Sequence, residues 1–444
     1  MTRSTTIRRR PRTRHKKQAP ARGLALPGTG AKVHEHRLRN GLRVILLERP
    51  DIPVVTSLLW YGAGSRHEAP HEAGVAHFLE HMMFKGTKRF GKGVVDATAT
   101  SLGGSINAFT SYDHTAYWFE LASDRFEAAL ELEADRMGGL LLDPDEFSNE
   151  KAVVLEELSM GRDSPWSRLR QDVSHVLFGR HPYGAPIIGH PETLESMHVD
   201  LMRGWYERTY QPCMGTLVLA GDLHPSSALS LVRKHFGKVP RGEPAPFVPC
   251  APLRVPEGER RIEKRWDDAA SRLMMAWRTT SVGTDEDFDL DLIDTLLTGG
   301  RVSRLHKRLV LTEGLATMVG SSSDTLVEGG AFWLHAEAVP GVDPAALEKV
   351  VDEEIQRLAE ELVPVKELRR VQRTLRSRDA FEVETVSDLA EWFGGLAVDA
   401  DWRLLLELEE RRAQVNAKRI RVTARKLLTS DRRVIGWSLP GGGV

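Results

Sequence analysis

The chain of 444 residues has few cysteines and no long apolar segment. Its two cysteines, Cys213 and Cys250, follow prolines and lack the spacing of a metal-binding pair, so we expect reduced thiols rather than a disulfide. No stretch approaches the roughly 20 uninterrupted apolar residues of a membrane span. The run Gly23–Pro27 is too short for the apolar region of a secretory signal. These absences favour a soluble protein with its own core and a cytoplasmic location.

Net charge is also nearly absent, at −1, but the charges are unevenly distributed. Residues 1–34 contain ten Lys or Arg and no acidic residue, which leaves 51 basic and 62 acidic residues in the rest, a balance of −11. The basic run Arg8–Lys17 could bind nucleic acid or an anionic membrane. The simpler interpretation is a disordered basic arm over residues 1–32 with no site of its own, so we expect no nucleic-acid partner.

The sequence does contain a pair of histidines in a helical setting. The run Gly74–Phe84 has apolar residues at the three-and-four spacing of one buried helical face. These residues are Val75, Phe78, Leu79, Met82 and Met83. On such a helix His77 and His81 lie one turn apart, and Glu80 lies over the same face. Zinc held by two histidines needs a third ligand and an open position for water, whose pKa falls to about 7 on the metal. A carboxylate beside that water can then take its proton.

A second helix could supply the third ligand, which matters because a His-x-x-Glu-His pentad can also arise by chance. Asp143 followed by Pro144 predicts the start of a helix that continues over residues 146–160. Glu150 and Glu157 are seven apart on it and share one face. Three apolar residues are expected to pack this helix against the protein: Val153, Val154 and Leu158. A carboxylate from this helix would complete a three-ligand site.

Several longer segments carry a more specific similarity. They are Gly64–Glu68, Gly74–Thr87, Gly103–Tyr117 and Glu150–Leu158. In order and spacing they resemble the M16 metallopeptidases, the insulinase-like family with an inverted zinc motif. The resemblance implies a zinc metalloendopeptidase with one Zn²⁺ per chain, held by the two histidines and by Glu157, 76 positions after His81. It further implies that Glu80 is the general base and that Glu150 orients a zinc-bound histidine.

Substrate binding is expected on an extended run after the paired glycines Gly103 and Gly104. Asn107, Ala108 and Thr110 lie on this run. An exposed strand edge beside the metal could take up a peptide as an added strand, with sequence-tolerant backbone pairing. The alternative is an ordinary sheet strand that follows a glycine turn.

A proline-rich stretch divides the chain into two parts. We predict a zinc-bearing domain at residues 33–240, an extended linker at 241–258 and a metal-free domain at 259–444. Laying Trp60 on Trp277, an offset of 217 residues, matches strand to strand and helix to helix, which indicates an internal duplication. The predicted fold class is α+β, with two homologous α/β-sandwich domains, each a mixed, mostly antiparallel sheet with helices packed on it.

The same overlay predicts that the second domain holds no metal. It places Asp294, Leu297 and Thr298 where the first domain has its His-Glu-His trio. These three side chains cannot reproduce the zinc site. The second half therefore keeps the scaffold without the ion.

The resemblance also points to a missing feature. In the family pattern the metal-free domain supplies an Arg and a Tyr, seven apart, after a Gly-Gly-x-x-Ser-Arg-Leu phrase. That phrase is present at Gly299–Leu305, where a tight turn and helix start is the simpler role, but the matching positions hold Val310 and Thr317. Neither can stabilise an oxyanion as Arg and Tyr would. We therefore expect a heterodimer with a homologous chain that supplies the Arg/Tyr pair and closes a chamber around a peptide or unfolded segment. The alternative is a non-catalytic scaffold or assembly subunit, which would not need the complete zinc motif.

Overall fold

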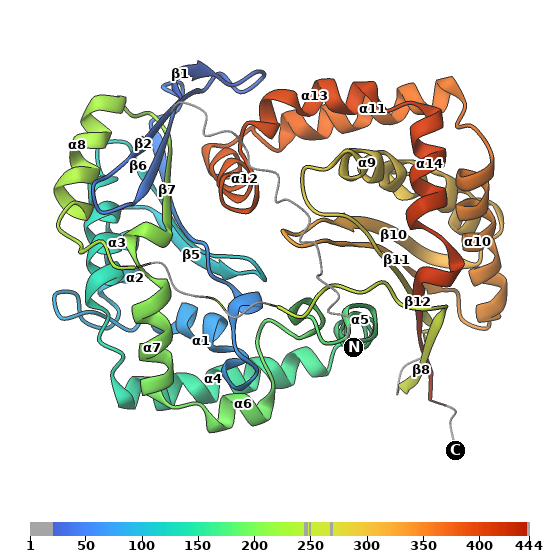
Figure 1. Cartoon of the computed structure of the whole chain (residues 1–444), viewed down its shortest axis with the longest axis horizontal. Helices are drawn as coiled ribbons and strands as arrows, with labels where there is room; N and C mark the ends of the chain where they lie inside the picture. Colours follow the sequence, from blue (N-terminus) through green and yellow to red (C-terminus); the bar gives the residue numbers. More distant parts are fainter. Residues whose placement is uncertain (1–20, 244–246, 248–249, 267–269, 442–444) are drawn as a thin grey trace, which may run out of the picture.

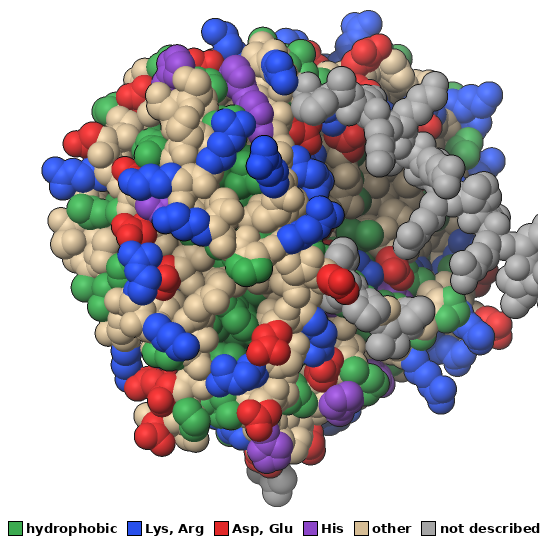
Figure 2. Space-filling model, turned by 60° about the vertical axis from the view of Figure 1, so that its left-hand side comes forward, with side chains coloured by type: hydrophobic (Ala, Val, Ile, Leu, Met, Phe, Trp, Pro, Cys, Tyr) green, Lys and Arg blue, Asp and Glu red, His purple; other side chains and the backbone are tan. Residues whose placement is uncertain are grey.

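A computed structural model describes residues 21–243, 247, 250–266 and 270–441, so the basic run Arg8–Lys17 lies outside the described residues. Each half of the chain forms a domain around one β-sheet, and the two domains lie side by side (Figure 1). None of the described helices is both long enough and apolar enough to cross a membrane. Charged side chains of both signs are interspersed over the face shown in Figure 2.

The first sheet has seven strands in the order β1-β2-β3-β7-β4-β6-β5. All neighbouring strands are antiparallel except β3 and β7, which are parallel. The strands are β1 (Arg22–Ala25), β2 (Lys32–Arg37), β3 (Arg43–Glu48), β4 (Val54–Tyr61), β5 (Ser105–Thr110), β6 (Thr115–Ala122) and β7 (Gly215–Gly221). The central strands β3, β4 and β7 are buried on both faces, which explains their nearly continuous apolar sequences. Strand β5 is left at an edge.

Helices of the same domain cover one face of this sheet. They are α1 (Val75–Met82), α2 (Val94–Ser101), α3 (Glu127–Gly139), α4 (Pro144–Arg162), α6 (Pro191–Ser196), α7 (Val199–Thr209) and α8 (Pro225–Phe236). Leu59, Phe78, Leu130 and Trp205 are fully buried in the core between these helices and the sheet. Helix α1, which carries His77 and His81, is therefore held by the main core of the first domain.

The second sheet repeats the arrangement of the first. Its order is β10-β11-β9-β12-β8, with only β12 and β8 parallel, which reproduces the series β5-β6-β4-β7-β3 strand by strand. The strands are β8 (Arg260–Trp266), β9 (Arg272–Arg278), β10 (Ala316–Asp324), β11 (Ala331–Ala338) and β12 (Arg433–Pro440). The helices of this half are α9 (Asp285–Thr298), a π-helical segment (His306–Thr312), α10 (Pro344–Glu360), α11 (Val365–Phe381), α12 (Val386–Asp399), α13 (Leu404–Gln414) and α14 (Ala417–Leu427). The predicted fold class and internal duplication are confirmed.

The two domains exchange one helix each, which the sequence did not indicate. Helix α5 (Pro165–Phe178) follows α1 and α4 in the chain but packs on the second sheet, where Val173 belongs to a buried cluster that includes Met274. Helix α12 packs on the first sheet, where Phe393 and Trp60 belong to one buried cluster. Each sheet therefore has one face covered by its own domain and the other face covered by a helix from the other domain.

The N-terminal boundary needs a correction. Residues 22–32 are not part of a disordered arm, because β1 pairs with β2 and Leu24 lies opposite Val33. Strand β1 lacks an alternating pattern of its own, so only its partner β2 reveals it. The described residues of the linker 241–258 contain no helix or strand, and both cysteines are free thiols.

Candidate metal centre

Helix α1 (Val75–Met82) carries the two histidines, and close backbone contacts fix its start. Gly74 precedes it with a φ of 94°, and a Cβ there would lie 2.5 Å from the carbonyl oxygen of Ile188, so the position requires glycine. The carboxylate of Glu68 accepts hydrogen bonds from the N–H groups of Gly74 at 2.9 Å and Ala76 at 2.8 Å. It thereby satisfies donors at the helix N-terminus, a role for Glu68 that the sequence analysis did not assign.

Helix α4 (Pro144–Arg162) contacts α1 and begins at the predicted cap. The side chain of Asp143 accepts hydrogen bonds from two N–H groups of the first turn. Val154 is buried, but Val153 is 51% exposed, so its predicted packing role is wrong. Val153 precedes Glu157 by four residues and therefore lies on the same helical stripe, which is open to solvent.

The structure brings His77, His81 and Glu157 together at one point. Nε2 of His77 lies 3.6 Å from Oε1 of Glu157, and Nε2 of His81 lies 3.5 Å from Oε2 of the same carboxylate. Three ligand atoms, one from each residue, all lie within 4.8 Å of one another. In a tetrahedral zinc site with bonds of about 2.0–2.2 Å, neighbouring ligand atoms are about 3.3–3.6 Å apart. The arrangement therefore fits a zinc ion better than direct hydrogen bonds, which are shorter.

The protonation state of His77 also suits a metal ligand. Burial, with a smaller effect of His81, lowers the pKa of His77 to about 4, so the imidazole is neutral at pH 7. Neutral imidazole is the form that binds metal. Its Nδ1 is buried and has no hydrogen-bond partner among the described groups. Only Nε2 faces a polar neighbour, and that neighbour is the carboxylate of Glu157.

His81 is oriented by a carboxylate on its other ring nitrogen. Its Nδ1 lies 3.0 Å from Oε1 of Glu150, and Nζ of Lys85 lies 2.5 Å from Oε2. Burial raises the pKa of Glu150, but the hydrogen bonds from Lys85 and His81 outweigh this effect and leave the pKa lowered. An ionised Glu150 accepts the Nδ1 proton, which frees Nε2 for a metal. Lys85 was not singled out from the sequence, although it follows His81 by four residues.

Glu80 lies beside the three ligands and contacts the neighbouring strand. The hydroxyl of Thr110 donates a hydrogen bond of 2.5 Å to Oε2 of Glu80. Burial raises the pKa of Glu80, and the bond from Thr110 opposes that shift. Thr110 therefore orients Glu80, the predicted base, and the contact of Thr110 with peptide stays a prediction. Asn107 and Ala108 lie on the edge strand β5, where Asn107 is exposed and Ala108 is half-buried.

The equivalent place in the second domain is closed by hydrogen bonds. The hydroxyl of Ser321 on β10 donates to Asp294 at 2.6 Å and lies 2.7 Å from the hydroxyl of Thr298. Val310 belongs to the π-helical segment and packs against the core, and Thr317 on β10 donates to the carbonyl of Glu337. Neither position supplies a charged or phenolic group.

A second group of possible ligands among the described residues consists of His181, Cys250 and Glu328. Nδ1 of His181 accepts a hydrogen bond from the N–H group of Tyr183, so the proton resides on Nε2, which lies 3.3 Å from Glu328. Glu328 is also paired with Arg66 at 3.0 Å. The imidazole and the carboxylate are thus engaged with each other and with a cation, and the group is a hydrogen-bond network rather than a metal site.

Comparisons with known proteins agree with this geometry. The model of the family described as insulinase (peptidase family M16) matches residues 43–190, and that of the peptidase M16 inactive domain matches residues 196–375. An uncharacterized zinc protease of Mycobacterium leprae is 31% identical over 329 residues, which is 74% of this chain and 74% of its own length.

Solved structures show the same fold. A protease from Helicobacter pylori superposes with a TM-score of 0.88 at 24% identity, over 92% of this chain and all of its own. The periplasmic protease PqqL of Escherichia coli superposes with a TM-score of 0.78 at 20% identity, over 92% of this chain but 48% of its own. On the strength of these sequence matches, the chain belongs to the insulinase family of peptidases, M16.

Proposed function

We propose that the chain is a zinc-dependent endopeptidase that hydrolyses peptides or unfolded polypeptide segments. The observation that carries this proposal is the convergence of His77, His81 and Glu157 on one point, with the carboxylate of Glu80 beside them. The naming of the mycobacterial relative as a zinc protease supports it.

Each side chain of the centre has a separate task. His77, His81 and Glu157 would hold one zinc ion per chain, which when bound polarises the scissile carbonyl and acidifies water. Glu80 accepts the proton of the attacking water and then returns it to the leaving amine. Burial raises the pKa of Glu80 above its ordinary value, which makes this carboxylate a stronger proton acceptor.

The surroundings of the centre support a peptide as substrate. Strand β5 is an edge strand, so its outer N–H and C=O groups are free to pair with an extended chain. A cavity of about 840 Å³ begins at Thr110 and Glu157 and continues between the domains to Phe178, Leu326 and Trp333. Its apolar walls suit a side chain of the bound peptide. Asn107 and Ala108 are the proposed contacts along the strand.

A partner chain is part of the proposal. The family resemblance places the oxyanion donors Arg and Tyr at two positions that here hold Val310 and Thr317. PqqL is about twice the length of this chain, so this chain corresponds to one half of that protease. We infer that a homologous chain supplies the second half of a chamber and the missing donors.

The metal and base roles can be separated by three variants assayed for bound zinc and for peptide hydrolysis. Glu80→Gln should keep its zinc and lose at least about 100-fold in hydrolysis, the scale of a lost general base. Glu157→Gln should lose zinc as well as activity. Glu156→Gln is the matched control, because Glu156 is the exposed neighbour of Glu157 and makes no described ion pair.

Two outcomes would contradict the proposal. If Glu80→Gln emptied the site while Glu157→Gln kept its zinc, the two roles would be reversed. If all three variants bound zinc and behaved like the parent protein, the site would have no catalytic function, and the scaffold interpretation would hold instead.

A further inference from the structure

A basic groove lies between α11 and α13 in the second domain, well separated from α1 (Figure 1). It encloses about 710 Å³, a volume typical of small-molecule sites. Five of its lining residues are cationic: Lys366, Arg369, Arg373, Arg376 and Arg412. Two are acidic, Asp379 and Glu409. The groove is thus positively charged in a chain whose residues after 34 carry a balance of −11.

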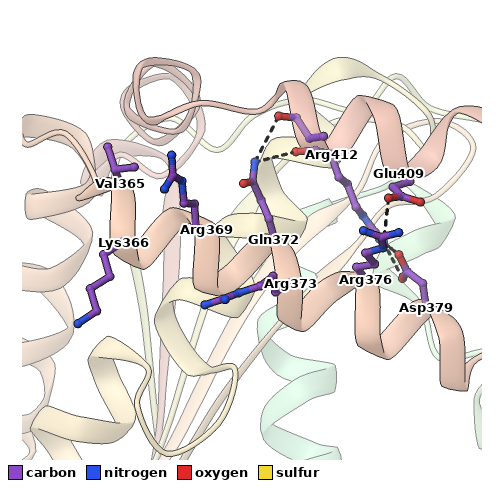
Figure 3. Close-up of a pocket in the computed structure, with 10 residues that line it drawn as sticks. Val365, Lys366, Arg369, Gln372, Arg373, Arg376, Asp379, Glu409 and Arg412 are labelled. Carbon is purple, nitrogen blue, oxygen red and sulfur yellow. Dashed lines mark hydrogen bonds and ion pairs between the residues drawn. The ribbon is translucent and has the colours of Figure 1, made fainter.

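The charges at one end of the groove are already compensated. Arg376 pairs with Glu409 at 3.2 Å, and Arg412 pairs with Asp379 and with Asp291, both at 2.6 Å. Figure 3 shows Arg376, Glu409, Arg412 and Asp379 together on one side of the groove. These pairs fix the two helices relative to each other, and because two arginines meet three carboxylates, no cation at this end is left unpaired for a ligand.

The other end holds cations that pair with no carboxylate of the described residues. Lys366, Arg369 and Arg373 are exposed, and Figure 3 draws no interaction from them to the other lining residues. They follow one another at spacings of three and four residues, so they share one side of α11 over about 10 Å. A row of this length can contact several anionic groups at once.

A neighbouring amide removes the acceptors that these cations could otherwise use. The C-terminal carbonyls of a helix attract cations. At the C-terminal end of α13, the side-chain amide of Gln372 donates to the carbonyls of Arg412, Ala413 and Val415 at 3.2–3.4 Å. Arg369 and Arg373 flank Gln372 on α11 and are left for an external ligand.

We propose that this groove binds an anion that carries a chain of phosphate groups. Guanidinium groups fit phosphate oxygens with paired hydrogen bonds, and three uncompensated cations match several phosphate charges. No aromatic residue lines the groove, so a nucleobase would gain no stacking partner. Recognition therefore rests on the phosphates alone, whether they belong to a nucleotide or to an inorganic polyphosphate.

An acidic polypeptide segment is a less suitable occupant. Asp379, Glu409 and Asp291 outnumber the two arginines at the ion-paired end, so this end would repel the continuation of an acidic chain along the groove. The absence of aromatic lining residues also argues against single-stranded nucleic acid, which binds proteins largely by stacking on aromatic rings.

The proposal can be tested by calorimetry on the full-length, zinc-loaded chain at low salt. The probes are inorganic tripolyphosphate, ATP and adenosine. We expect tripolyphosphate and ATP to bind with affinities within about threefold of each other, adenosine not to bind, and added salt to weaken binding. The double variant R369Q/R373Q should weaken both phosphate ligands at least tenfold. R378Q is the matched control, because Arg378 lies on the same helix outside the groove and should leave binding unchanged.

Other results would overturn the proposal. Tripolyphosphate binding that persists in R369Q/R373Q would come from the zinc centre or another surface. ATP binding much tighter than tripolyphosphate binding would show recognition of the base. A decaglutamate peptide or an oligouridine that bound more tightly than tripolyphosphate would make the groove a polypeptide or RNA site. Unfolding midpoints measured without ligand would show whether the variants are folded, as expected for substitutions at exposed, unpaired side chains.

Discussion

The hydroxyl of Thr110 lies 2.5 Å from Oε2 of Glu80. Thr110 ends strand β5, and Glu80 lies on helix α1, so this bond joins the proposed peptide-binding edge to the proposed base. A hydrogen bond to one carboxylate oxygen holds the second oxygen in a fixed orientation, which favours proton transfer to it. In the proposed function, strand β5 would therefore both position the peptide and orient Glu80.

Replacing Thr110 by Val should lower kcat about ten- to a hundredfold, because a hydrogen bond to a charged group contributes about 1.5–3 kcal/mol. Zinc content should stay that of the parent protein. Thr110→Ser retains the hydroxyl and should restore most of the rate. If Val and Ser variants had equal activity, the bond would have no part in catalysis.

Replacing Lys85 by Met should weaken zinc binding about ten- to a hundredfold, since partners behind a metal ligand usually have effects of this size. The cause is loss of the cation that keeps Glu150 ionised beside His81. Zinc affinity can be measured by competition with a chelator. Lys92→Met is a matched control, because Lys92 also pairs with a glutamate of α4, Glu146, that touches no ligand. Equal effects of both variants would contradict the prediction.

Two neighbouring glycines of α12 should respond differently to alanine. A Cβ at Gly394 would lie 2.2 Å from Nε1 of Trp60, whereas one at Gly395 would lie 3.7 Å from the same ring. Alanine normally favours a helix by about 0.8–1 kcal/mol over glycine. We expect Gly395→Ala to be neutral or stabilising, and Gly394→Ala to lower the free energy of unfolding by about 1–3 kcal/mol through overpacking. Urea unfolding of both variants checks this difference, and equal stabilities would show that α12 does not press on Trp60.

The pH dependence of stability should change in Asp294→Asn. Burial raises the pKa of Asp294 from 3.8 to about 6, while the bond from Ser321 opposes the shift. Between these values the folded state binds more protons than the unfolded state, so the free energy of unfolding falls as pH rises from about 4 to 6. Asparagine keeps an acceptor for Ser321 and does not ionise. We expect the variant to gain up to about 3 kcal/mol at pH 7.5 and nothing below pH 4, as measured by urea unfolding. A gain that was the same at every pH would rule out this cause.

The isolated chain should hydrolyse peptides only weakly. A homodimer would again bring Val310 and Thr317, and loss of an oxyanion donor typically costs about 3–4 kcal/mol, a few hundredfold in rate. Adding a homologous chain with Arg and Tyr at those positions should raise turnover by about that factor. The assay is cleavage of an unstructured peptide library with and without the partner. Strong turnover by the isolated chain, unchanged by any partner, would mean that another residue supplies the donor.

The parts of the metal centre that depend on local spacing could be predicted from the sequence. His77 and His81 share a helical face because of their spacing, and the cap at Asp143 depends on adjacent residues. The contacts of Glu68 and Thr110 could not be predicted, because each joins segments whose relative position is set by packing. Val153 was misplaced for a related reason, since helical periodicity does not say which stripe faces solvent.

The fold, too, was predictable only in part. The overlay of Trp60 on Trp277 indicated two similar sheets, and the structure has them. The exchange of α5 and α12 was not visible in the sequence, because an apolar helix face does not specify which of two similar sheets it covers. Strand β1 was assigned to the arm because it is too short and irregular to be recognised without its partner β2.

Because of the exchanged helices, the two domains are joined by buried non-covalent contacts as well as by the linker. If a protease cut the segment 241–258, α5 would still lie on the second sheet and α12 on the first. The two fragments of the cut protein would therefore stay associated through the packing of α5 and α12. Either half expressed alone would expose one apolar face of its sheet and the apolar side of its exchanged helix. We therefore expect the separate halves to aggregate and the co-expressed halves to stay soluble.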